Sequence, residues 1–574
     1  MHAGGISTSY LERPWLNLYP PNVNIDMEVE QVPLFSLVDD SILRYPDRAA
    51  MVYLGTTITY RQLGGYIDRT AEALFSMGIK KGSVVAIYLP NCPQFAMAFY
   101  ALLKIGAIPT AVSFLYTPRE MRQQLSDSGA ECVIMLDLMY EKQMQMLSEL
   151  KIEKVILTSL VCFLSPVKRL FGRLAGKIPK FTPPEGTSPP FLEQLIAPLS
   201  GKVYPKADVK PGDVALISYT AGTTGLPKGI KLTHYNFVAG MRQVLEFSNG
   251  YDLGKSNYLL SYLPFFHIYA QSIMLTAGLA KGMTLVVIPV PKFDEILSMI
   301  DKYAVSMFFG VPASYSLMLK HLHGDKYRLR SLRICFSGAD KMPPNVMREF
   351  SQLTGAPIAE GYGLTETCGA ALAQLCRGQK DGSVGIPLPM TYAAILNPEA
   401  DEFVPVGKVG EIAVCGPQVT TEVWRNPERT AKYFATVGGK RWLRTGDIGM
   451  MDDEGWFYFV ERIKDIIKYK GFQVFPKELE RIMCAHPAIK EAAVIGVSAK
   501  EGYQVIKAFI VLKDGMLGKV SKEQITDFCS QNLAPYKIPK EIEFIDELPR
   551  NRLGKVMRED LRERENHANG NHTK

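Results

Sequence analysis

Short apolar runs alternate with amphipathic stretches over most of the chain. Residues 84–89 form one such run, and residues 95–105 after them have a helical period. Comparable strand candidates recur at residues 132–136, 154–157, 214–219, 284–288, 306–310 and 333–337. This alternation is typical of α/β folds, so we expect a large N-terminal domain of doubly wound, mainly parallel sheets.

The pattern changes in the last third of the chain. Shorter β segments with glycine turns, at residues 410–414 and 455–460, predict a β-rich subdomain at about residues 400–460. A charged stretch at residues 461–465 then precedes a compact unit of roughly 100 residues, the size of a small independent domain. We therefore expect an N-terminal domain at residues 1–463, a small α+β C-terminal domain at 464–562 and a disordered tail at 563–574.

Composition excludes several classes of protein. The 574 residues include 65 basic and 58 acidic side chains, and the formal charge of +7 is too small and too dispersed to indicate nucleic-acid binding. The nine cysteines are scattered without metal-site spacing, so we expect reduced, buried thiols. The longest apolar run, residues 155–164, is too short to span a bilayer, and no leader-type pattern is visible. We therefore expect a cytoplasmic protein.

A segment rich in glycine and threonine, residues 219–229, predicts a phosphate-binding loop at the end of a strand. Its glycines let backbone amides turn toward one point, its threonines add hydroxyl donors, and Lys228 supplies a positive charge. The segment is not the P-loop of NTPases, because Leu226 and Pro227 precede Lys228 and Gly229 follows it. A plain glycine and threonine turn between two strands is the alternative.

Three further motifs follow in order. Residues 360–367 combine a glycine turn with an aromatic ring, a hydroxyl and the Glu366 carboxylate, which suits a nucleotide beside Mg²⁺. Residues 442–447 end in Asp447, a carboxylate able to accept two ribose hydroxyl hydrogen bonds. Residues 549–555 end in Lys555, on a glycine turn. Each motif alone is more often structural than functional, but chance is a poor explanation for four in this order.

With these motifs the chain resembles the adenylate-forming superfamily of acyl-CoA synthetases, luciferases and peptide-synthetase adenylation domains, over residues 33–562. It is most similar to fatty-acyl-CoA ligases and 4-coumarate-CoA ligases, and residues 13–16 and 263–269 are of the kind found in bacterial long-chain acyl-CoA ligases. The resemblance implies that ATP activates a medium- or long-chain fatty acid as acyl-AMP, and that coenzyme A then receives the acyl group.

Two alternatives stay open. One is an aryl- or hydroxycinnamate-CoA ligase. The other is a non-catalytic acyl-binding or transport protein on the same fold, which would lack catalytic residues that this chain retains: Lys555, Glu366, Asp447 and Lys228. Many members of the superfamily have Ser where Ala221 stands, so we expect an adjusted affinity for ATP.

The resemblance also implies roles for individual residues in the first half-reaction. Lys555 would bridge the substrate carboxylate and the α-phosphate, and His267 would lie between the adenylate and the acyl pocket, which Tyr269 lines. A lone histidine in an apolar run is otherwise usually a core residue. Thr365 and Glu366 would position the α-phosphate, and Glu366 and Thr224 would bind Mg²⁺. The implied nucleotide-binding residues are Thr220, Ala221, Gly222, Thr223, Thr224 and Lys228 for phosphates, Gly338, Ala339, Asp340, Glu360, Gly361 and Tyr362 for adenine, and Asp447 and Arg462 for ribose.

For the second half-reaction the resemblance implies that the C-terminal domain is mobile. It would rotate about a hinge at Lys464, withdraw Lys555 and present another face. On that face Lys470 and Gly471 match positions that contact coenzyme A, and Lys468 and Gln473 match positions that face the adenylate. A solvated basic strand edge is the alternative for this stretch.

Residues 165–178 form an amphipathic pattern. Ser165 can cap a helix that has Pro166 at its first position and Pro179 at its end. Apolar side chains fall on one face of this helix and basic ones on the other. Peripheral binding to an anionic membrane is the functional interpretation, and a surface helix packed on its own domain is the alternative. Acyl chain length and oligomeric state are not set by the sequence, and a homodimer is one alternative.

Overall fold

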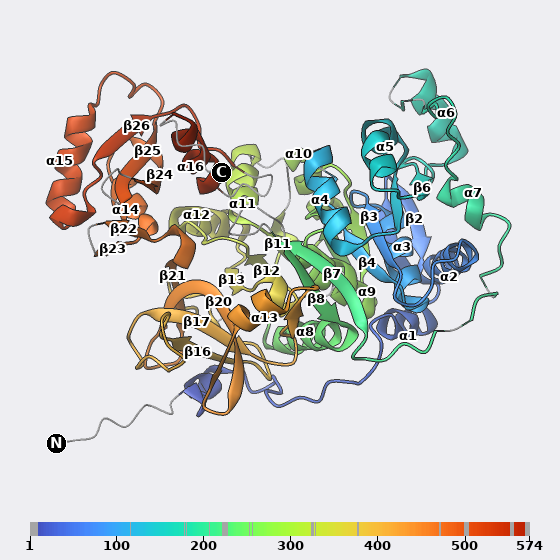
Figure 1. Cartoon of the computed structure of the whole chain (residues 1–574), viewed down its shortest axis with the longest axis horizontal. Coiled ribbons are helices and arrows are strands. Elements are labelled where there is room, and N and C mark those ends of the chain that lie inside the picture. Colours follow the sequence, from blue (N-terminus) through green and yellow to red (C-terminus); the bar gives the residue numbers. More distant parts are fainter. Residues whose placement is uncertain are drawn as a thin grey trace.

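The computed structural model describes residues 10–114, 116–176, 178–179, 181–201, 203–205, 207–220, 228–251, 253–254, 256–322, 327, 329–375, 378–469, 472–498, 504–550 and 556–568. Parallel sheets and their helices form the large N-terminal domain, and the C-terminal domain lies at one end of it (Figure 1). Among the described residues, no helix has both the length and the apolar character needed to cross a bilayer.

One sheet of the large domain is wholly parallel, in the order β4-β3-β5-β6. Its strands are β3 (Val84–Tyr88), β4 (Ile108–Ala111), β5 (Cys132–Leu136) and β6 (Lys154–Thr158), and α4 (Pro118–Ser128) and α5 (Tyr140–Glu149) connect them. A second sheet has the order β2-β1-β10-β9, with β1 (Ala49–Tyr53), β2 (Thr56–Thr59), β9 (Tyr258–Ser261) and β10 (Thr284–Val287). These strands confirm the predicted parallel α/β layers.

The core of the large domain includes a helix that is apolar on all sides. Every residue of α3 (Pro93–Lys104) from Pro93 to Leu103 is buried, and α3 packs on α2 (Tyr60–Ser76). A helix with no polar face must be enclosed by other elements. The same apolar cluster includes side chains of both sheets, so they share one continuous core.

A third sheet carries the segments that lead to the functional site. Its order is β11-β12-β13-β14-β15, with β11 (Met307–Gly310), β12 (Ile334–Ser337) and β13 (Ile358–Tyr362) parallel. The short β14 (Leu372–Ala373) and β15 (Ile386–Pro387) add antiparallel pairs. The helices α10 (Phe293–Lys302), α11 (Pro312–His321) and α12 (Pro344–Thr354) accompany this sheet. The carboxyl ends of parallel strands are where α/β proteins usually bind ligands.

The predicted phosphate loop connects two antiparallel strands. β7 (Val214–Thr220) pairs with β8 (Lys228–Thr233), and β18 (Glu422–Val423) extends the sheet. The pairing of Thr220 with Lys228 closes the base of this hairpin. α8 (His234–Phe247) then begins with a capping box in which the Thr233 side chain accepts a hydrogen bond from the Asn236 backbone.

The β-rich subdomain is present and begins slightly before the predicted residue 400. Its antiparallel strands are β16 (Tyr392–Leu396), β17 (Gly410–Cys415), β19 (Phe434–Val437), β20 (Lys440–Met451) and β21 (Phe457–Arg462). α13 (Pro427–Tyr433) lies between β18 and β19. A separate apolar cluster, which includes the buried Trp15 and Trp442, forms the core of this subdomain.

The C-terminal domain mixes helices and strands, as predicted. The hairpin β22 (Ile467–Tyr469) and β23 (Phe472–Val474) precedes a sheet of β24 (Ile489–Ser498), β25 (Gln504–Leu512) and β26 (Glu541–Phe544). α14 (Pro476–Met483), α15 (Lys522–Asn532) and α16 (Arg558–Ala568) complete the domain. The prediction of a disordered tail from residue 563 is wrong for residues 563–568, because α16 continues through them and its Leu561 and Glu565 are buried.

Two smaller predictions also change. The amphipathic helix, α6 (Pro166–Leu174), starts as predicted, because the Ser165 hydroxyl accepts a hydrogen bond from the Lys168 backbone at 3.3 Å. It ends before Pro179, since Gly176 has a left-handed backbone with φ of 66°. The cysteines in the described part of the chain are free thiols, but Cys484 is exposed and not buried.

Candidate active site

A cavity of about 2410 Å³ lies between the large domain and the C-terminal domain. Side chains from both domains line it, including Lys477 and Arg481 of α14 on the C-terminal side. This volume exceeds that of an ordinary small-molecule pocket, so the cavity can hold more than one ligand group. The predicted site residues that line it are Thr220, Lys228, His267, Tyr269, Gly338, Ala339, Asp340, Gly361, Tyr362, Thr365, Glu366, Arg462 and Lys464.

Glu366 is a buried carboxylate at the wall of this cavity, with 8% of its surface exposed. It lies in a single 3-10 turn, Thr365–Thr367, where its carbonyl accepts a hydrogen bond from the Thr420 backbone at 2.8 Å. Burial raises the pKa of Glu366, and the nearby charges of Arg462 and Lys228 offset only part of that rise. The fold thus places the carboxylate oxygens of Glu366 at the cavity wall, and oxygen atoms of this kind are the ligands that Mg²⁺ prefers.

Lys228 lies at the base of the predicted phosphate loop and faces the Glu366 carboxylate. Burial lowers the pKa of Lys228, and the positive charge of Arg429 lowers it further. Its ammonium also lies 5.6 Å from the centre of the Tyr433 ring. The predicted loop residues Ala221, Gly222, Thr223 and Thr224 are outside the described residues. The neighbouring cations would favour a polyanion between them.

Asp447 is held beneath the cavity floor and does not line it. Its carboxylate accepts a hydrogen bond from the Tyr362 hydroxyl at 2.8 Å and lies 3.1 Å from Nε of Arg462. Asp447 of β20 is paired with Arg462 of β21. This strand pairing brings the two residues together although they belong to different sequence segments. Burial raises the pKa of Tyr362 well above its usual value. The two residues predicted for the ribose are therefore in contact, and Arg462 is the one that lines the cavity.

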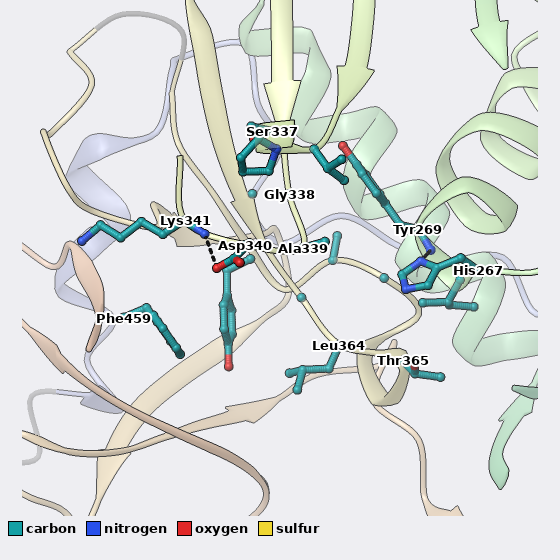
Figure 2. A pocket seen from close by; sticks show the side chains of 18 of the residues that line it. His267, Tyr269, Ser337, Gly338, Ala339, Asp340, Lys341, Leu364, Thr365 and Phe459 are labelled. Atoms are coloured by element: carbon teal, nitrogen blue, oxygen red, sulfur yellow. Dashed lines mark hydrogen bonds between the residues drawn. The ribbon is translucent and has the colours of Figure 1, made fainter. Parts of the chain in front are cut away.

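The predicted adenine segment Gly338–Asp340 forms one wall of the cavity beyond β12. Figure 2 shows Asp340 and Phe459 on one side of this region and His267 and Tyr269 on the other. Ala339 has a left-handed backbone with φ of 70°, which is uncommon outside glycine and typical of functional turns. A Cβ on Gly338 would lie 3.5 Å from the Tyr269 ring, so the two segments are in close contact.

Glu360 does not line the cavity, although it was predicted to. Its carboxylate accepts a hydrogen bond from the Met342 backbone at 2.8 Å and is 6% exposed. A buried backbone donor needs a partner, so the Met342 N–H holds the Glu360 carboxylate against the loop at residues 340–342 and away from the cavity. Glu360 instead supports the loop that follows Asp340 from behind.

His267 and Tyr269 line the opposite wall. Nδ1 of His267 accepts a hydrogen bond from the Tyr269 backbone at 3.3 Å (Figure 2). A neutral imidazole that accepts at Nδ1 carries its proton on Nε2. The chain continues into a π-helix, η5 (Ala270–Ala277), and then into α9 (Gly278–Ala280). π-helical turns are rare and often occur at functional sites.

The catalytic lysine predicted in the C-terminal domain, Lys555, is outside the described residues. Arg550 and Val556 on either side of it pair in a β-bridge, and both line the cavity. The chain therefore returns to the cavity on both sides of residues 551–555. This arrangement is the one that the first half-reaction would need.

The predicted hinge residue Lys464 also lines the cavity, within the short turn Ile463–Asp465. Its neighbour Asp465 is buried and makes ion pairs with Arg562 at 2.7 Å and Arg558 at 3.6 Å. Burial would raise the pKa of Asp465, but the two arginines lower it overall. The hinge is thus tied to α16 of the domain that it would rotate.

The predicted coenzyme A face lies away from the cavity. Lys468 and Gln473 are paired across the β22–β23 hairpin, and both are exposed. Neither lines the cavity. Lys470 and Gly471 are outside the described residues. Most of the described residues predicted for the first half-reaction therefore line the cavity, and the two described residues predicted for the second lie on another surface.

Several lining residues were not predicted from the sequence. Arg429 and Tyr433 lie one turn apart on α13, and burial together with the nearby Glu366 carboxylate raises the pKa of the Tyr433 hydroxyl. Their spacing on one helix face was the available signal. Phe459 and Lys477 were also missed, because a strand residue and a helix residue acquire this role only through the packing of the two domains.

Comparisons with known proteins agree with this geometry. The chain matches the family described as AMP-binding enzyme over residues 38–424, and the AMP-binding enzyme C-terminal domain over residues 478–555. It is 35% identical over 563 residues to a long-chain-fatty-acid–CoA ligase of Bacillus subtilis, covering 96% of this chain and 98% of that protein. It is 32% identical over 520 residues to 4-coumarate–CoA ligase 3 of Oryza sativa, covering 89% and 88%.

A solved structure shows the same fold. ATP-bound MatB from Rhodopseudomonas palustris superposes with a TM-score of 0.80 at 26% identity, covering 93% of this chain and 99% of that chain. The match spans both domains.

Proposed function

Because the chain belongs to the AMP-binding enzyme family, we propose that it is an ATP-dependent, AMP-forming fatty-acyl-CoA ligase. One observation carries the proposal. A single cavity joins a phosphate-binding end, with Lys228 and Glu366, to an apolar arm that begins at His267 and Tyr269. Long-chain-fatty-acid–CoA ligases are among its relatives over nearly the full chain, and they support a fatty acid as the substrate.

In the first half-reaction a carboxylate oxygen of the fatty acid attacks the α-phosphorus of ATP. The bond from that phosphorus to the bridging oxygen breaks, and pyrophosphate leaves with the bond's electron pair. Lys228 and residues 220–224 hold the leaving pyrophosphate, and Lys555 neutralises charge between the carboxylate and the α-phosphate. Gly338, Ala339 and Gly361 line the adenine pocket, and Arg462 with Asp447 binds the ribose.

Mg²⁺ fits the donor set at the phosphate end. Glu366 offers a buried carboxylate at the cavity wall, and Thr224 would add a hydroxyl. The ion would neutralise phosphate charge as the leaving group departs. Thr365 and Glu366 then orient the α-phosphate.

The second half-reaction needs another arrangement of the domains. The C-terminal domain rotates at Lys464 and brings Lys468 and Gln473 toward the adenylate, with Lys470 and Gly471 contacting coenzyme A. The thiol sulfur bonds to the acyl carbon, the thiol proton is released, and AMP leaves as the bond from the acyl carbon to the phosphate oxygen breaks. The exposed side chains of Lys468 and Gln473 on the β22–β23 hairpin support this proposal, since they are available to meet the adenylate after such a movement.

Measuring the two half-reactions separately tests the function. Pyrophosphate release is measured with ATP and fatty acids of increasing length, and thioester formation is measured with coenzyme A and synthetic acyl-AMP. Lys555→Ala should lower the first rate by at least a hundredfold and the second far less. A preference for hydroxycinnamates over all fatty acids would favour the aryl-CoA ligase. Fatty-acid binding without pyrophosphate release would indicate a non-catalytic acyl-binding protein.

We also propose that α6 attaches the protein peripherally to anionic membrane, on the cytoplasmic leaflet. Four large apolar side chains of this short helix are exposed: Val167 by 63%, Leu170 by 58%, Phe171 by 66% and Leu174 by 75%. Lys168, Arg169 and Arg173 lie on the same helix, and α6 projects from the outer edge of the large domain (Figure 1). Apolar insertion combined with basic side chains suits an interface with anionic lipid.

Flotation with liposomes tests this attachment. Leu170→Glu combined with Phe171→Glu should abolish co-flotation with phosphatidylglycerol vesicles. A matched control carries Leu353→Glu and Leu517→Glu, which replace side chains that are 61% and 74% exposed outside α6. Equal flotation of both variants would overturn the membrane proposal. A homodimer stays a separate prediction, which sedimentation velocity tests.

A further inference from the structure

The inner arm of the cavity, defined as the part lined by residues 244–309, is almost wholly apolar. Leu259 of β9, Met307 of β11 and Met283 lie on its walls and are buried. Such a lining suits a hydrocarbon chain, because burying apolar surface stabilises binding by about 25 cal/mol per Å².

One helical segment runs along this arm. Ile273, Ala277 and Lys281 all line the cavity and are spaced four residues apart, so they share one side of η5 and α9. From Tyr269 to Lys281 the segment advances on the order of 15–18 Å. The arm thus begins at His267 and Tyr269, beside the nucleotide end, and reaches Lys281 at its far end.

Among the described lining residues 244–309, Lys281 is the one formally charged side chain, His267 at the mouth aside; Lys320 of α11 also lines the cavity. Burial lowers the pKa of Lys281, and no neighbouring charge contributes. Within the described ranges no acidic side chain shifts the pKa of Lys281, and the residue is exposed to solvent. An ammonium group at the outer end of an apolar arm is available to a ligand anion.

The backbone around Lys281 is firmly positioned. Its N–H donates to the Ala277 carbonyl at 3.0 Å, and Nη1 of Arg48 donates to the Gly282 carbonyl at 2.9 Å. Gly282 has φ of 73°, and a Cβ there would meet the Tyr45 ring at 2.5 Å. A lysine at a helix end also interacts with the helix dipole, but that interaction does not require a place on a cavity wall.

We propose that Lys281 binds the distal carboxylate of long-chain α,ω-dicarboxylic acids in the acyl arm. This inference rests on the proposed function and names a second substrate class for the same site. One carboxylate of the diacid would react at the nucleotide end while the other pairs with Lys281. Because both ends are held, activity toward diacids should have a sharper optimum of chain length than activity toward monocarboxylic acids.

The test compares diacids with monocarboxylic acids of equal length, from ten to eighteen carbons. Pyrophosphate release gives kcat/KM for each acid with the wild type, Lys281→Met, Lys281→Arg and the control Lys302→Met, which replaces an exposed lysine outside the cavity. At the best diacid length, Lys281→Met should lower the ratio of diacid to monoacid kcat/KM by about five- to tenfold. Lys281→Arg should largely retain this ratio, and the control should leave it unchanged.

An unchanged ratio in Lys281→Met at every length would overturn the inference. Turnover of monoacids by the wild type with no turnover of any diacid would also overturn it, and would leave the proposed function intact. Absence of pyrophosphate release with every acid would instead contradict the proposed function.

Discussion

At the residue scale, Glu366 combines a functional requirement with a cost to folding. Its carboxylate is buried at the cavity wall, and burial raises its pKa. Between its ordinary pKa and the raised one, the folded protein binds more protons than the unfolded chain. The free energy of unfolding therefore falls as pH rises through that range, and the ionised carboxylate lowers stability above it.

Glu366→Gln should raise stability and remove activity. Without an ionisable group, the variant should unfold at higher urea concentration than the wild type at pH 7.5. The difference should shrink as pH falls toward 4.5, the ordinary pKa of a glutamate. Pyrophosphate release should drop by roughly a hundredfold.

Urea melts of both proteins across this pH range provide the measurement. Thr365→Val serves as a control, because it alters the same turn and leaves the carboxylate in place. Lower stability of Glu366→Gln at every pH would show that attraction to Arg462 and Lys228 outweighs burial.

The sequence predicted the residue types of the site better than their orientation. Lys228, Glu366, Arg462 and His267 were expected near the ligand, and all line the cavity. Glu360 lies behind the wall instead, because the direction of a strand side chain depends on which face of the strand the neighbouring layers cover. A sequence motif identifies the chemical groups that a site needs, but the packing of the fold determines which of these groups face the site.

At the element scale, the π-helix η5 forms part of the wall of the proposed acyl arm. Its wider turn carries Ile273 and Ala277 along the cavity, and β9 and α8 pack against it. The period of apolar residues does not distinguish a π-helix from an α-helix in a wholly buried segment, so this element was not predicted. The strands predicted for the parallel sheets match β3, β5, β6, β10, β11 and β12 to within about a residue, because continuous apolar runs between turns mark them directly, whereas β1, β4, β9 and β13 were not singled out.

Ala277→Phe should shorten the acids that the enzyme accepts. The larger ring would fill the middle of the arm, so kcat/KM should fall more than tenfold for sixteen-carbon acids and little for eight-carbon acids. A series of acids assayed by pyrophosphate release gives the profile. Thermal melting checks that overpacking has not unfolded the variant. A parallel loss at all chain lengths would contradict this assignment of the arm.

At the scale of the whole molecule, an ion pair links the two domains in the observed arrangement. Lys477 of α14 lies 3.2 Å from Asp340 of the adenine segment, and its ammonium lies 4.7 Å from the centre of the Phe459 ring. The Lys477–Asp340 pair joins the C-terminal domain to the segment predicted to line the adenine pocket. Because rotation at Lys464 would break it, the pair should favour only the first half-reaction.

Lys477→Met should therefore slow acyl-AMP formation and spare thioester formation. A partly exposed ion pair contributes about 0.2–1 kcal/mol, so the first rate should fall about two- to fivefold. Saturating ATP separates this effect from nucleotide binding. Lys537→Met is the matched control, since it removes the 2.7 Å pair between Lys537 and Glu478 within the C-terminal domain. Equal losses in both half-reactions would contradict a role in domain orientation.

Because the base of the β7–β8 hairpin is closed, residues 221–227 form a segment that can be exchanged for another sequence. Strand pairing holds Thr220 and Lys228 opposite each other, so swapping the segment between them leaves both anchors in register. A one-residue slip of β8 would instead turn Lys228 to the opposite face of the sheet. Loop segments from related ligases can thus be transplanted here to tune nucleotide affinity, whereas insertions within β8 would destroy the site. Divergence among homologues should accordingly be penalised at Thr220 and Lys228, and also at residues 221–224, which are proposed to hold the phosphates.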